Sequence, residues 1–564
     1  MKRAHLVAIG LLLLTFIAYA NILDNEFVWD DSRFIQNAPE TRTFARATES
    51  LGEDVYQIYR PIRTFAYYFA YRLFGLRPWA YHLLSILLHA AVSFLLYLII
   101  RKLFPEPAAL LTAALFAIHP NNVGRVANAT ASFDLIGVIF YLLSFYFYLR
   151  FREANSRKHL MVSLLIFALG LFSSEEAYTL PFLILVYEFV FQERKVSTYK
   201  AGAIYLALLG LFLFLRIGIL HIGARISTYP GGSAWVTFLS MPLALWTYVS
   251  FIFYPVSLSP FRAITFVQSA SDFRFWLPLL GILLVAFLVY RFRNKKEILF
   301  FAGWLGVTML PFLNIAPLPQ LMAERYFYLP SVALLFGISS LLLFFKQKKI
   351  LIAAVIIILL SLTWWQNSFW QNDFTLMGRG AQLNPQSSQA LNNLGTWYFN
   401  LQQYNDAHKY FLASVKADPE SHRAWVNLGV LYSSTGNYNQ SLFALQQALR
   451  LTPGNYNAYE KLGITYMRMN ETEKAEEALL TSIRLEPRYY RSYATLGSLY
   501  GNEGRYDLAL QYLEKSIELN PTYAESYYNL GILYDNLGQP AKAQEYYRKA
   551  YALEPKPYYQ ERIR

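Results

Sequence analysis

The sequence contains no cysteine, and only 15% of its 564 residues are charged. The absence of cysteine excludes disulfides, thiolate zinc sites and cysteine nucleophiles. The low charge, together with an apolar content of 55%, excludes a single soluble globule. The formal net charge is +13, but the basic residues cluster in short loops between apolar runs. This pattern is typical of a membrane protein with a fixed orientation, and we expect no nucleic-acid partner.

The sequence also lacks the short motifs of the commonest hydrolases and nucleotide-binding proteins. It has no HExxH helix, no Walker loop and no GxSxG nucleophile elbow. Hydrolysis by the usual nucleophiles and nucleotide use through the usual phosphate cradle therefore have no support.

Successive apolar runs are long enough, or nearly long enough, to cross a bilayer of about 30 Å. They lie near residues 4–20, 81–100, 107–118, 133–149, 160–174, 179–191, 201–217, 275–290, 298–313, 328–345 and 350–366. If the basic loops between them are cytoplasmic, these spans alternate and the chain leaves the last one on the outer side. A further run at 235–254, interrupted by Pro242, then begins and ends outside. We predict that it is a re-entrant or interfacial helix.

The first apolar run ends in AYA followed by Asn21, a pattern typical of a signal-peptidase site. We nevertheless expect an uncleaved anchor, because the chemistry described below needs Asp30 at a fixed depth. With this topology residues 21–80 are extracytoplasmic, as is every other strongly polar cluster outside the basic loops. That convergence is the main argument for a functional site on the outer side.

The last third of the sequence repeats every 34 residues. Prolines recur at this step from Pro385 to Pro555, and Leu-Gly pairs end at Gly395, Gly429, Gly463, Gly497 and Gly531. Small residues let two antiparallel helices approach, an aromatic side chain fills the gap, and proline ends the second helix, as in tetratricopeptide repeats. We therefore predict an all-α chain: a transmembrane helix bundle over 1–366, a linker at 367–387, a solenoid of five repeats over 388–557 and a tail at 558–564.

The concave groove of such a solenoid usually binds a peptide segment rather than catalysing a reaction. Asn393, Asn427 and Asn529 share one repeat position and are candidates for hydrogen bonds to a bound polypeptide backbone. The alternative is that Asn-Leu-Gly is simply repeat consensus.

Acidic and basic side chains on the outer side are the candidates for chemistry. Asp30 and Asp31 are adjacent in FVWDDSRFIQN, and Glu175 and Glu176 are adjacent in SSEEAY. The other candidates are Arg33, Arg60, Arg63, His119 and Arg325. A carboxylate can take a proton from a hydroxyl, while arginine stabilises charge on a phosphate leaving group. This combination suits group transfer from a lipid-linked phosphate to an alcohol.

We assign Asp30 as the general base and Asp31 as its helper, with helix N-capping by DDSR as the alternative. We expect Glu175 and Glu176 to end an apolar helix, where the helix dipole disfavours negative charge and a functional reason is favoured.

Two further positions have competing interpretations. His119 precedes Pro120 and is expected to be a hydrogen-bonded interfacial residue, with ligand contact as the lesser alternative. Arg325 either forms an ion pair with the adjacent Glu324 or binds a polyprenyl phosphate.

Several segments occur in the same order in a known family. FVWDDSRFIQN, YRPIRTFAYYFAYRLFG, IHPNNVGRVANATASFDLIGVIFYLLSF, SSEEAYTLP, AERYFYLPS and WQNDFTLMGRGAQLNP resemble the transmembrane and tetratricopeptide-repeat-containing (TMTC) protein O-mannosyltransferases. These proteins are similar to GT-C glycosyltransferases, multi-span enzymes that use dolichol- or polyprenyl-phosphate sugars and generally invert the anomeric centre. The resemblance implies Asp30 as the base and Arg325 as a contact to the lipid phosphate. The chain departs from its relatives in having Glu175-Glu176 for a Lys-Glu pair and HPNN for HPR.

We therefore expect an inverting GT-C glycosyltransferase that moves a sugar, mannose by the resemblance, from a polyprenyl- or dolichyl-phosphate donor. The acceptor would be a hydroxyl of a secreted or membrane polypeptide held by the repeats. No cofactor or metal is required, although the acidic pair could bind a divalent ion. The expected location is the bacterial inner membrane with periplasmic repeats, or the endoplasmic reticulum membrane in a eukaryote. Two alternatives stay open: a non-catalytic anchored scaffold, and a transferase that acts on a glycolipid or surface polysaccharide.

Overall fold

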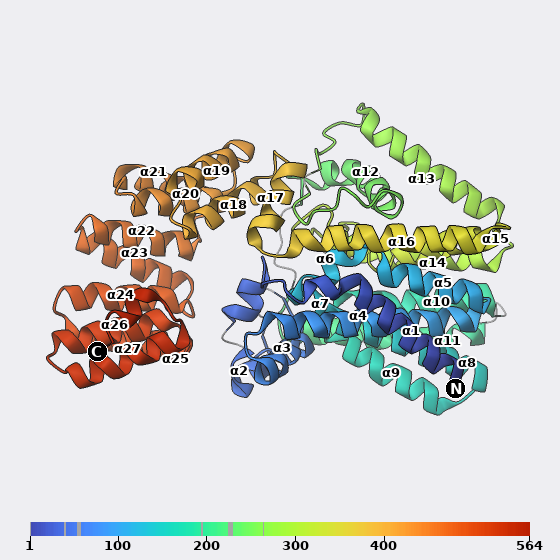
Figure 1. Cartoon of the computed structure of the whole chain (residues 1–564), viewed down its shortest axis with the longest axis horizontal. Helices are drawn as coiled ribbons and strands as arrows, with labels where there is room; N and C mark the ends of the chain where they lie inside the picture. Colours follow the sequence, from blue (N-terminus) through green and yellow to red (C-terminus); the bar gives the residue numbers. More distant parts are fainter. Residues whose placement is uncertain are drawn as a thin grey trace. The chain divides into compact units, whose positions relative to one another are not determined.

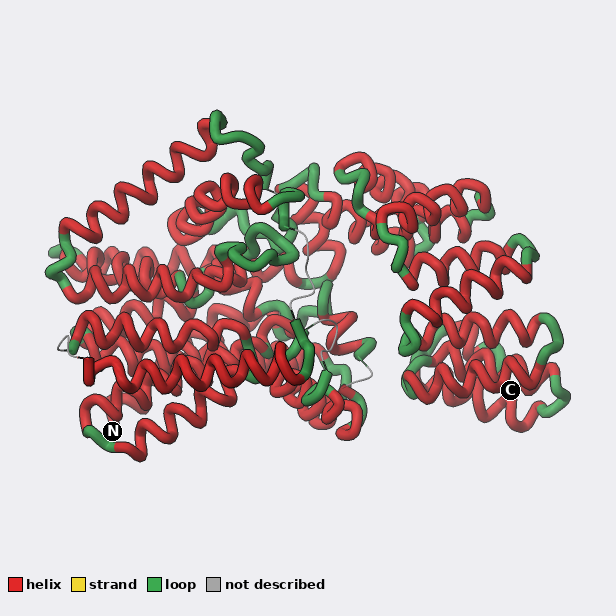
Figure 2. The backbone as a smooth tube through the Cα atoms, turned by 180° about the vertical axis from the view of Figure 1, so that it is seen from behind, coloured by secondary structure: helices red, strands yellow, loops and turns green. Residues whose placement is uncertain are grey.

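The computed structural model describes residues 2–38, 41–53, 58–192, 196–223, 229–262 and 264–563. Within these ranges the regular elements are helices and no strand is found (Figure 2). The chain divides into two compact units, Met1–Leu383 and Asn384–Arg564. The predicted all-α class is confirmed.

The first unit is a bundle of apolar helices. Its long helices are α1 (Lys2–Tyr19), α4 (Pro78–Leu103), α5 (Glu106–Ile118), α8 (Asp134–Ala154), α9 (Arg157–Leu171), α10 (Leu180–Phe191), α11 (Val196–Leu213), α12 (Ala234–Phe253), α13 (Phe273–Arg291), α14 (Lys296–Met309), α15 (Ser331–Phe344) and α16 (Lys348–Asn367). In the part of the chain that the structure describes, seven helical segments are long and apolar enough to cross a membrane. The chain is an integral membrane protein.

Exposed apolar side chains on α13 show why this unit needs a lipid environment. Leu277 is 69% exposed and Phe287 is 60% exposed. A continuous apolar surface of this kind is unfavourable in water but suits contact with lipid chains. The helix α12 is also long and apolar enough to span a bilayer, so its re-entrant placement stays a prediction.

The two ends of the bundle carry different side chains. At one end Arg3 pairs with Glu106 at 3.2 Å, and Lys102 pairs with Glu153 at 2.6 Å. The opposite end holds the short helices α2 (Phe44–Glu49), α3 (Pro61–Phe74), α6 (Val123–Val126) and α7 (Ala129–Ser132) (Figure 1). Arg3 and Lys102, from two of the basic segments, thus lie at the end opposite the short helices, which agrees with the predicted separation of basic and polar segments.

The end of α1 is fixed against α16. The indole Nε1 of Trp364 donates a hydrogen bond to the carbonyl oxygen of Ile17 at 2.6 Å. The amide Nδ2 of Asn367 donates to the carbonyl oxygen of Ala18 at 3.0 Å. These bonds hold the point from which the loop with Asp30 and Asp31 leaves the bundle, and the uncleaved anchor stays a prediction.

Residues 367–387, predicted to be a linker, are mostly helical and largely belong to the first unit. After α16 come η9 (Ser368–Trp370) and α17 (Asp373–Leu383). Arg379 Nη2 donates to the carbonyl oxygen of Val256 at 2.6 Å, and the Glu26 N–H donates to the carbonyl oxygen of Gln371 at 2.9 Å. The segment lacks a long apolar run, and its packing depends on polar contacts with distant parts of the chain, so its sequence alone resembles a linker.

The second unit is a series of antiparallel helix pairs. The pairs are α18 (Ser388–Asn400) with α19 (Tyr404–Ala417), α20 (His422–Ser434) with α21 (Tyr438–Leu451), α22 (Tyr456–Arg468) with α23 (Thr472–Leu485), α24 (Tyr490–Asn502) with α25 (Tyr506–Leu519), and α26 (Ala524–Asn536) with α27 (Pro540–Leu553). A short helix, α28 (Pro557–Gln560), follows them in the predicted tail.

Glycine at the repeat position of Gly463 allows the two helices of a pair to touch. A Cβ atom there would lie 2.7 Å from Cγ of Leu479, closer than real Cβ contacts. Ala475 on the facing helix is fully buried for the same reason. The predicted role of the small residues in the tetratricopeptide pattern is therefore confirmed.

Candidate active site

The loop after α1 gives its two aspartates different surroundings. Asp31 is fully buried, and its carboxylate accepts hydrogen bonds from the Val28 N–H at 3.1 Å and the Thr130 N–H at 2.7 Å. Burial raises the pKa of Asp31 to about 7. Asp30 is only half-buried. The backbone amides at the start of a helix lack partners within that helix. Asp31 accepts a hydrogen bond from one such amide on α7, that of Thr130. This structural role replaces its predicted role as helper to Asp30.

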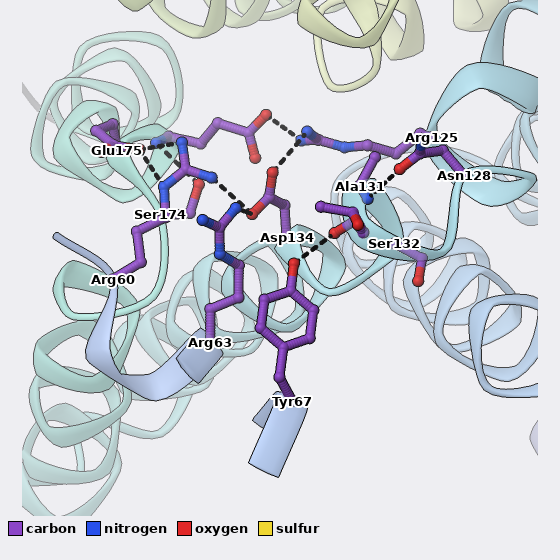
Figure 3. Close-up of polar contacts among 12 residues, drawn as sticks. Arg60, Arg63, Tyr67, Arg125, Asn128, Ala131, Ser132, Asp134, Ser174 and Glu175 are labelled. Atoms are coloured by element: carbon purple, nitrogen blue, oxygen red, sulfur yellow. Dashed lines mark hydrogen bonds and ion pairs between the residues drawn. The ribbon is translucent and has the colours of Figure 1, made fainter. Parts of the chain in front are cut away.

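Buried arginines and carboxylates meet beside this loop (Figure 3). Arg60 contacts Asp134 at 2.6 Å and Glu175 at 2.5 Å, and Arg63 contacts the same Asp134 oxygen at 3.0 Å. Asp134 begins α8, whereas the two arginines flank the start of α3. The contacts therefore fix α3 against α8 and the loop that contains Glu175.

A third arginine extends this arrangement. Arg125 in α6 lies 3.6 Å from Asp134 and also pairs with Glu176. We call the six residues the arginine–carboxylate network: Arg60, Arg63, Arg125, Asp134, Glu175 and Glu176. Its three guanidinium groups face three carboxylates, so the network has no surplus positive charge.

This balance favours a structural role for Arg60 and Glu175 over their predicted role as candidates for phosphate or substrate binding. Arg60 is already paired with two carboxylates. Burial alone would lower its pKa, but the charges of Asp134 and Glu175 together raise it well above the usual range. Burial pushes the pKa of Glu175 up, but Arg60 holds it below its ordinary value. The cavity beside Arg60 and Arg63 has a volume of about 10 Å³. It has room for about one water molecule and none for a sugar.

Glu175 and Glu176 do not end a helix as predicted. The helix α9 ends at Leu171, and the glutamates begin η5 (Glu175–Thr179), which leads into α10. Ser174 caps this turn by accepting a hydrogen bond from the Glu176 N–H at 3.3 Å. Negative charge is favoured at a helix start, so the dipole argument for a function was wrong. Burial raises the pKa of Glu176 even though Arg125 lies beside it.

Arg125 and Asp134 were missed as site residues from the sequence. Both lie in the segment VGRVANATASFD, which was predicted to be extracytoplasmic and polar. Arg125 is 4% exposed and Asp134 is 8% exposed. A single charge beside an apolar span is costly unless it is paired, and that signal could have identified both residues.

His119 has a structural role in this arrangement. It is 2% exposed; its Nδ1 accepts from the Asn121 N–H at 3.2 Å, and its Nε2 lies 3.2 Å from the carbonyl oxygen of Ile252. Burial lowers the pKa of His119 to about 4. Both ring nitrogens are therefore used by the backbone, and the predicted ligand contact is replaced by the hydrogen-bonded interpretation.

Arg325 lies next to the Asp30 loop. It belongs to η8 (Glu324–Phe327), and its guanidinium carbon is 5.4 Å from the ring centroid of Trp29. Trp29 directly precedes Asp30, and consecutive Cα atoms are about 3.8 Å apart. The Trp29 backbone has a φ of 55°, and its N–H donates to Asp373 Oδ1 at 2.8 Å. Arg325 thus contacts the residue that precedes Asp30 in the chain, and its predicted contact to the lipid phosphate stays a prediction.

Other predicted residues have weaker structural support. Arg33 is exposed, and its guanidinium carbon lies 5.5 Å from the ring centroid of Phe34. Its role in donor binding stays a prediction. Among the described residues no group of three or more His, Cys, Asp or Glu could hold a metal ion.

The three asparagines of the repeats share one position on α18, α20 and α26 and are half-buried. Asn427 donates to Asn392 Oδ1 at 2.9 Å and to Thr396 Oγ1 at 3.3 Å, which ties its repeat to the preceding one. This contact supports the repeat-consensus interpretation at Asn427. The roles of Asn393 and Asn529 stay predictions.

Two family models match the chain. One is described as dolichyl-phosphate-mannose-protein mannosyltransferase and matches residues 61–219. The other is described as the C-terminal domain of cilia and flagella-associated protein 70 and matches residues 370–564. The first covers α3 to η6 (Phe214–Ile219) and includes every member of the arginine–carboxylate network except Arg60.

Relatives match both parts of the chain. The protein O-mannosyl-transferase F38B6.6 of Caenorhabditis elegans is 25% identical over 440 residues, which cover 72% of this chain and 62% of the relative. Tmtc1 of Drosophila melanogaster is 30% identical over 177 residues, which cover 29% of this chain and 21% of the relative. TMTC3 of Mus musculus is 23% identical over 422 residues, which cover 64% of this chain and 45% of the relative. The chain is therefore similar to the TMTC protein O-mannosyl-transferases, and we call it TMTC-like.

The predicted family resemblance is confirmed by these matches. The TMTC-like chain nevertheless spans only 21% to 62% of the length of these three relatives. Among solved structures, the chain is similar to TTC0263, a thermophilic TPR protein of Thermus thermophilus. The sequence identity is 24% and the TM-score is 0.30, and the match covers 31% of this chain and 98% of TTC0263. This low score adds no argument to the helix pairs themselves.

Proposed function

We propose that the TMTC-like chain is a mannosyltransferase that moves mannose from a polyprenyl-phosphate donor to hydroxyl groups of polypeptides on the extracytoplasmic side. The observation that supports this proposal is the approach of Arg325 to Trp29, beside Asp30, at the polar end of the bundle. The relatives named as protein O-mannosyl-transferases supply the sugar and the class of acceptor.

In this mechanism Asp30 acts as the general base. It takes the proton from the acceptor hydroxyl as that oxygen forms a bond to C1 of mannose. The bond between C1 and the phosphate oxygen breaks, and its electron pair stays on the phosphate. Arg325 stabilises the charge that develops there. A single displacement of this type inverts the anomeric centre.

The arginine–carboxylate network has a positioning role. It joins α3, α6, α8 and η5. On α3, the Tyr67 hydroxyl donates to the carbonyl oxygen of Thr130 at 3.0 Å, and the Thr130 N–H in turn binds Asp31. Holding the loop rigid keeps Asp30 in the geometry that the transfer requires, and small displacements of catalytic groups are costly.

The repeats would bind the polypeptide acceptor. A solenoid groove can hold an extended segment, and the half-buried positions Asn393 and Asn529 can offer hydrogen bonds to its backbone. The membrane unit would then receive a hydroxyl from a segment that is already captured.

A chain that ends at Leu383, the boundary of the first unit, tests this division of labour. We expect it to bind the donor as the full chain does but to lose most protein modification, because acceptor capture is lost. Mass spectrometry of secreted proteins from cells that express each form would measure the modification. Donor binding by the purified shortened chain is the control that its helices remain folded. Unchanged protein modification would exclude acceptor capture by the repeats, and transfer to lipid alone would favour a glycolipid acceptor.

A further inference from the structure

Glu324 is a buried carboxylate surrounded by positive charge. It is 5% exposed, and its Oε1 accepts a hydrogen bond from the Ser259 N–H. The charges that act on it come from Arg262, Arg325 and Arg379. These arginines belong to three separate segments: the loop after α12, the turn η8, and α17 at the end of the first unit.

The donors of these arginines are only partly used. Arg262 Nη2 donates to Ser257 Oγ at 3.0 Å and to the Ser257 carbonyl oxygen, and Arg379 Nη2 donates to the Val256 carbonyl oxygen. The Nε atoms of Arg262 and Arg379 are buried and have no hydrogen-bond partner among the described residues. Buried donors without acceptors are rare in folded proteins and call for an explanation.

The charge balance here differs from that of the arginine–carboxylate network. The charges of three guanidinium groups act on the single carboxylate of Glu324, so among these four residues the positive charges exceed the negative charge by two. Burial also raises the pKa of Glu324 to about 7, so this carboxylate offsets the arginines only in part at neutral pH. An anion with several oxygen acceptors would satisfy both the surplus charge and the unused donors.

We propose that Arg262, Arg325 and Arg379 form one anion site that holds the phosphate of an isoprenoid-phosphate lipid, so that α17 completes the donor site. This inference rests on the proposed function, because the transfer supplies the lipid-linked phosphate. It goes further by assigning Arg262 and Arg379, which were not among the predicted site residues, and by giving a binding role to a segment that was predicted to be a linker.

The position of Trp29 connects this anion site to Asp30. The Trp29 ring lies 5.4 Å from the guanidinium carbon of Arg325 and 5.3 Å from the ring of Phe261, which precedes Arg262 in the chain. Its N–H donates to Asp373 on α17. The anion site is therefore built against the side chain of the residue that directly precedes the base, and transfer from a bound phosphate to a nearby hydroxyl requires such proximity.

The surplus of two positive charges also suits the chemistry. The sugar donor is a phosphodiester with one negative charge, and the lipid monophosphate that leaves has up to two. Because the charge on the phosphate grows as the bond to C1 breaks, the three arginines stabilise the leaving group more than the bound donor.

The test uses the purified full chain in nanodiscs of neutral lipid and measures polyprenyl monophosphate binding by intrinsic tryptophan fluorescence. We expect Arg262→Gln and Arg379→Gln each to weaken binding about 10-fold or more, because each removes a charged hydrogen-bond donor. Arg274→Gln is the matched control, because Arg274 is paired with Asp272 at 2.5 Å. It should bind as the unaltered chain does. Unchanged binding in both Arg262→Gln and Arg379→Gln would overturn the proposal.

Glu324→Gln separates an anion site from a general loss of structure. It removes the opposing charge but keeps an oxygen that can accept from the Ser259 N–H, so we expect tighter binding of polyprenyl monophosphate. A folding defect would weaken binding instead, and such a result would count against the site. For a phosphodiester ligand, whose charge is constant near neutral pH, affinity should rise as pH falls through about 7 and Glu324 becomes protonated. Glu324→Gln should abolish that rise.

Two further ligands identify the source of the phosphate. Phosphatidic acid and inorganic phosphate should displace bound polyprenyl monophosphate only at concentrations far above those at which polyprenyl monophosphate itself binds. Equal competition by either of these would overturn the assignment to an isoprenoid lipid. Arginine-dependent binding of the lipid phosphate without any transfer to polypeptide would support the anion site while refuting the proposed function.

Discussion

Replacing Asp30 by Asn is expected to lower mannosyl transfer by about 10²-fold to 10⁴-fold, the usual contribution of a general base. The amide keeps the size of the side chain but cannot accept the hydroxyl proton. Asp30 is half-buried and leads into the turn η2 (Ser32–Gln36), so the loop should keep its shape. The initial rate of mannose transfer to a Ser/Thr peptide by the purified chain measures the effect. The apparent Tm and donor binding should stay unchanged.

The neighbouring substitution, Asp31→Asn, should have the opposite outcome and serves as the matched control. Both oxygens of the buried Asp31 carboxylate accept backbone N–H groups. An Asn can accept only through one of these atoms, which leaves a buried donor unsatisfied at a cost of about 1–3 kcal/mol. We expect a lower Tm, with transfer kept in the molecules that remain folded. Loss of transfer in Asp31→Asn at unchanged Tm, or full transfer in Asp30→Asn, would contradict these assignments.

The helices and the repeats could be predicted because their signals are local. An apolar run long enough to cross a bilayer forms a helix whatever its neighbours are, since its backbone must be satisfied within the segment. The step from Pro385 to Pro555 likewise repeats one packing unit, and Gly463 occupies the position where that unit needs no side chain. The contact between Arg325 and Trp29, which precedes Asp30, could be predicted only as convergence on one side of the membrane.

The pairing of charges could not be predicted, because it depends on contacts between residues far apart in the sequence. Arg60 is 74 residues from Asp134 and 115 residues from Glu175, and nothing local shows that it is neutralised by both. The same limit applies to Arg379, whose place in a site could not be predicted from the sequence. Its partner on Val256 is 123 residues away, and the segment that carries it lacks the apolar run that would have marked it as part of the bundle.

Replacing Asp134 by Asn is expected to destabilise the first unit by about 3–5 kcal/mol, the usual cost of removing one partner from a buried ion pair. Asp134 contacts Arg60, Arg63 and Arg125, so three guanidinium groups would face only two carboxylates. The matched control is Glu153→Gln at the other end of α8. Glu153 pairs with Lys102, but its side chain is 50% exposed. An exposed pair contributes about 0–1 kcal/mol, so the control should change the Tm little.

A second substitution separates charge imbalance from loss of shape. Arg63 pairs only with Asp134 within the network, whereas Arg60 also pairs with Glu175 and Arg125 with Glu176. Adding Arg63→Met to Asp134→Asn leaves two arginines and two carboxylates, and replacing a buried pair by apolar groups is often close to neutral. We therefore expect the double variant to regain much of the Tm lost in Asp134→Asn. Two results would show that the network does not hold α3, α6, α8 and η5 together through its charge balance. One is a Tm of the double variant below that of Asp134→Asn, and the other is an Asp134→Asn variant that is no less stable than Glu153→Gln.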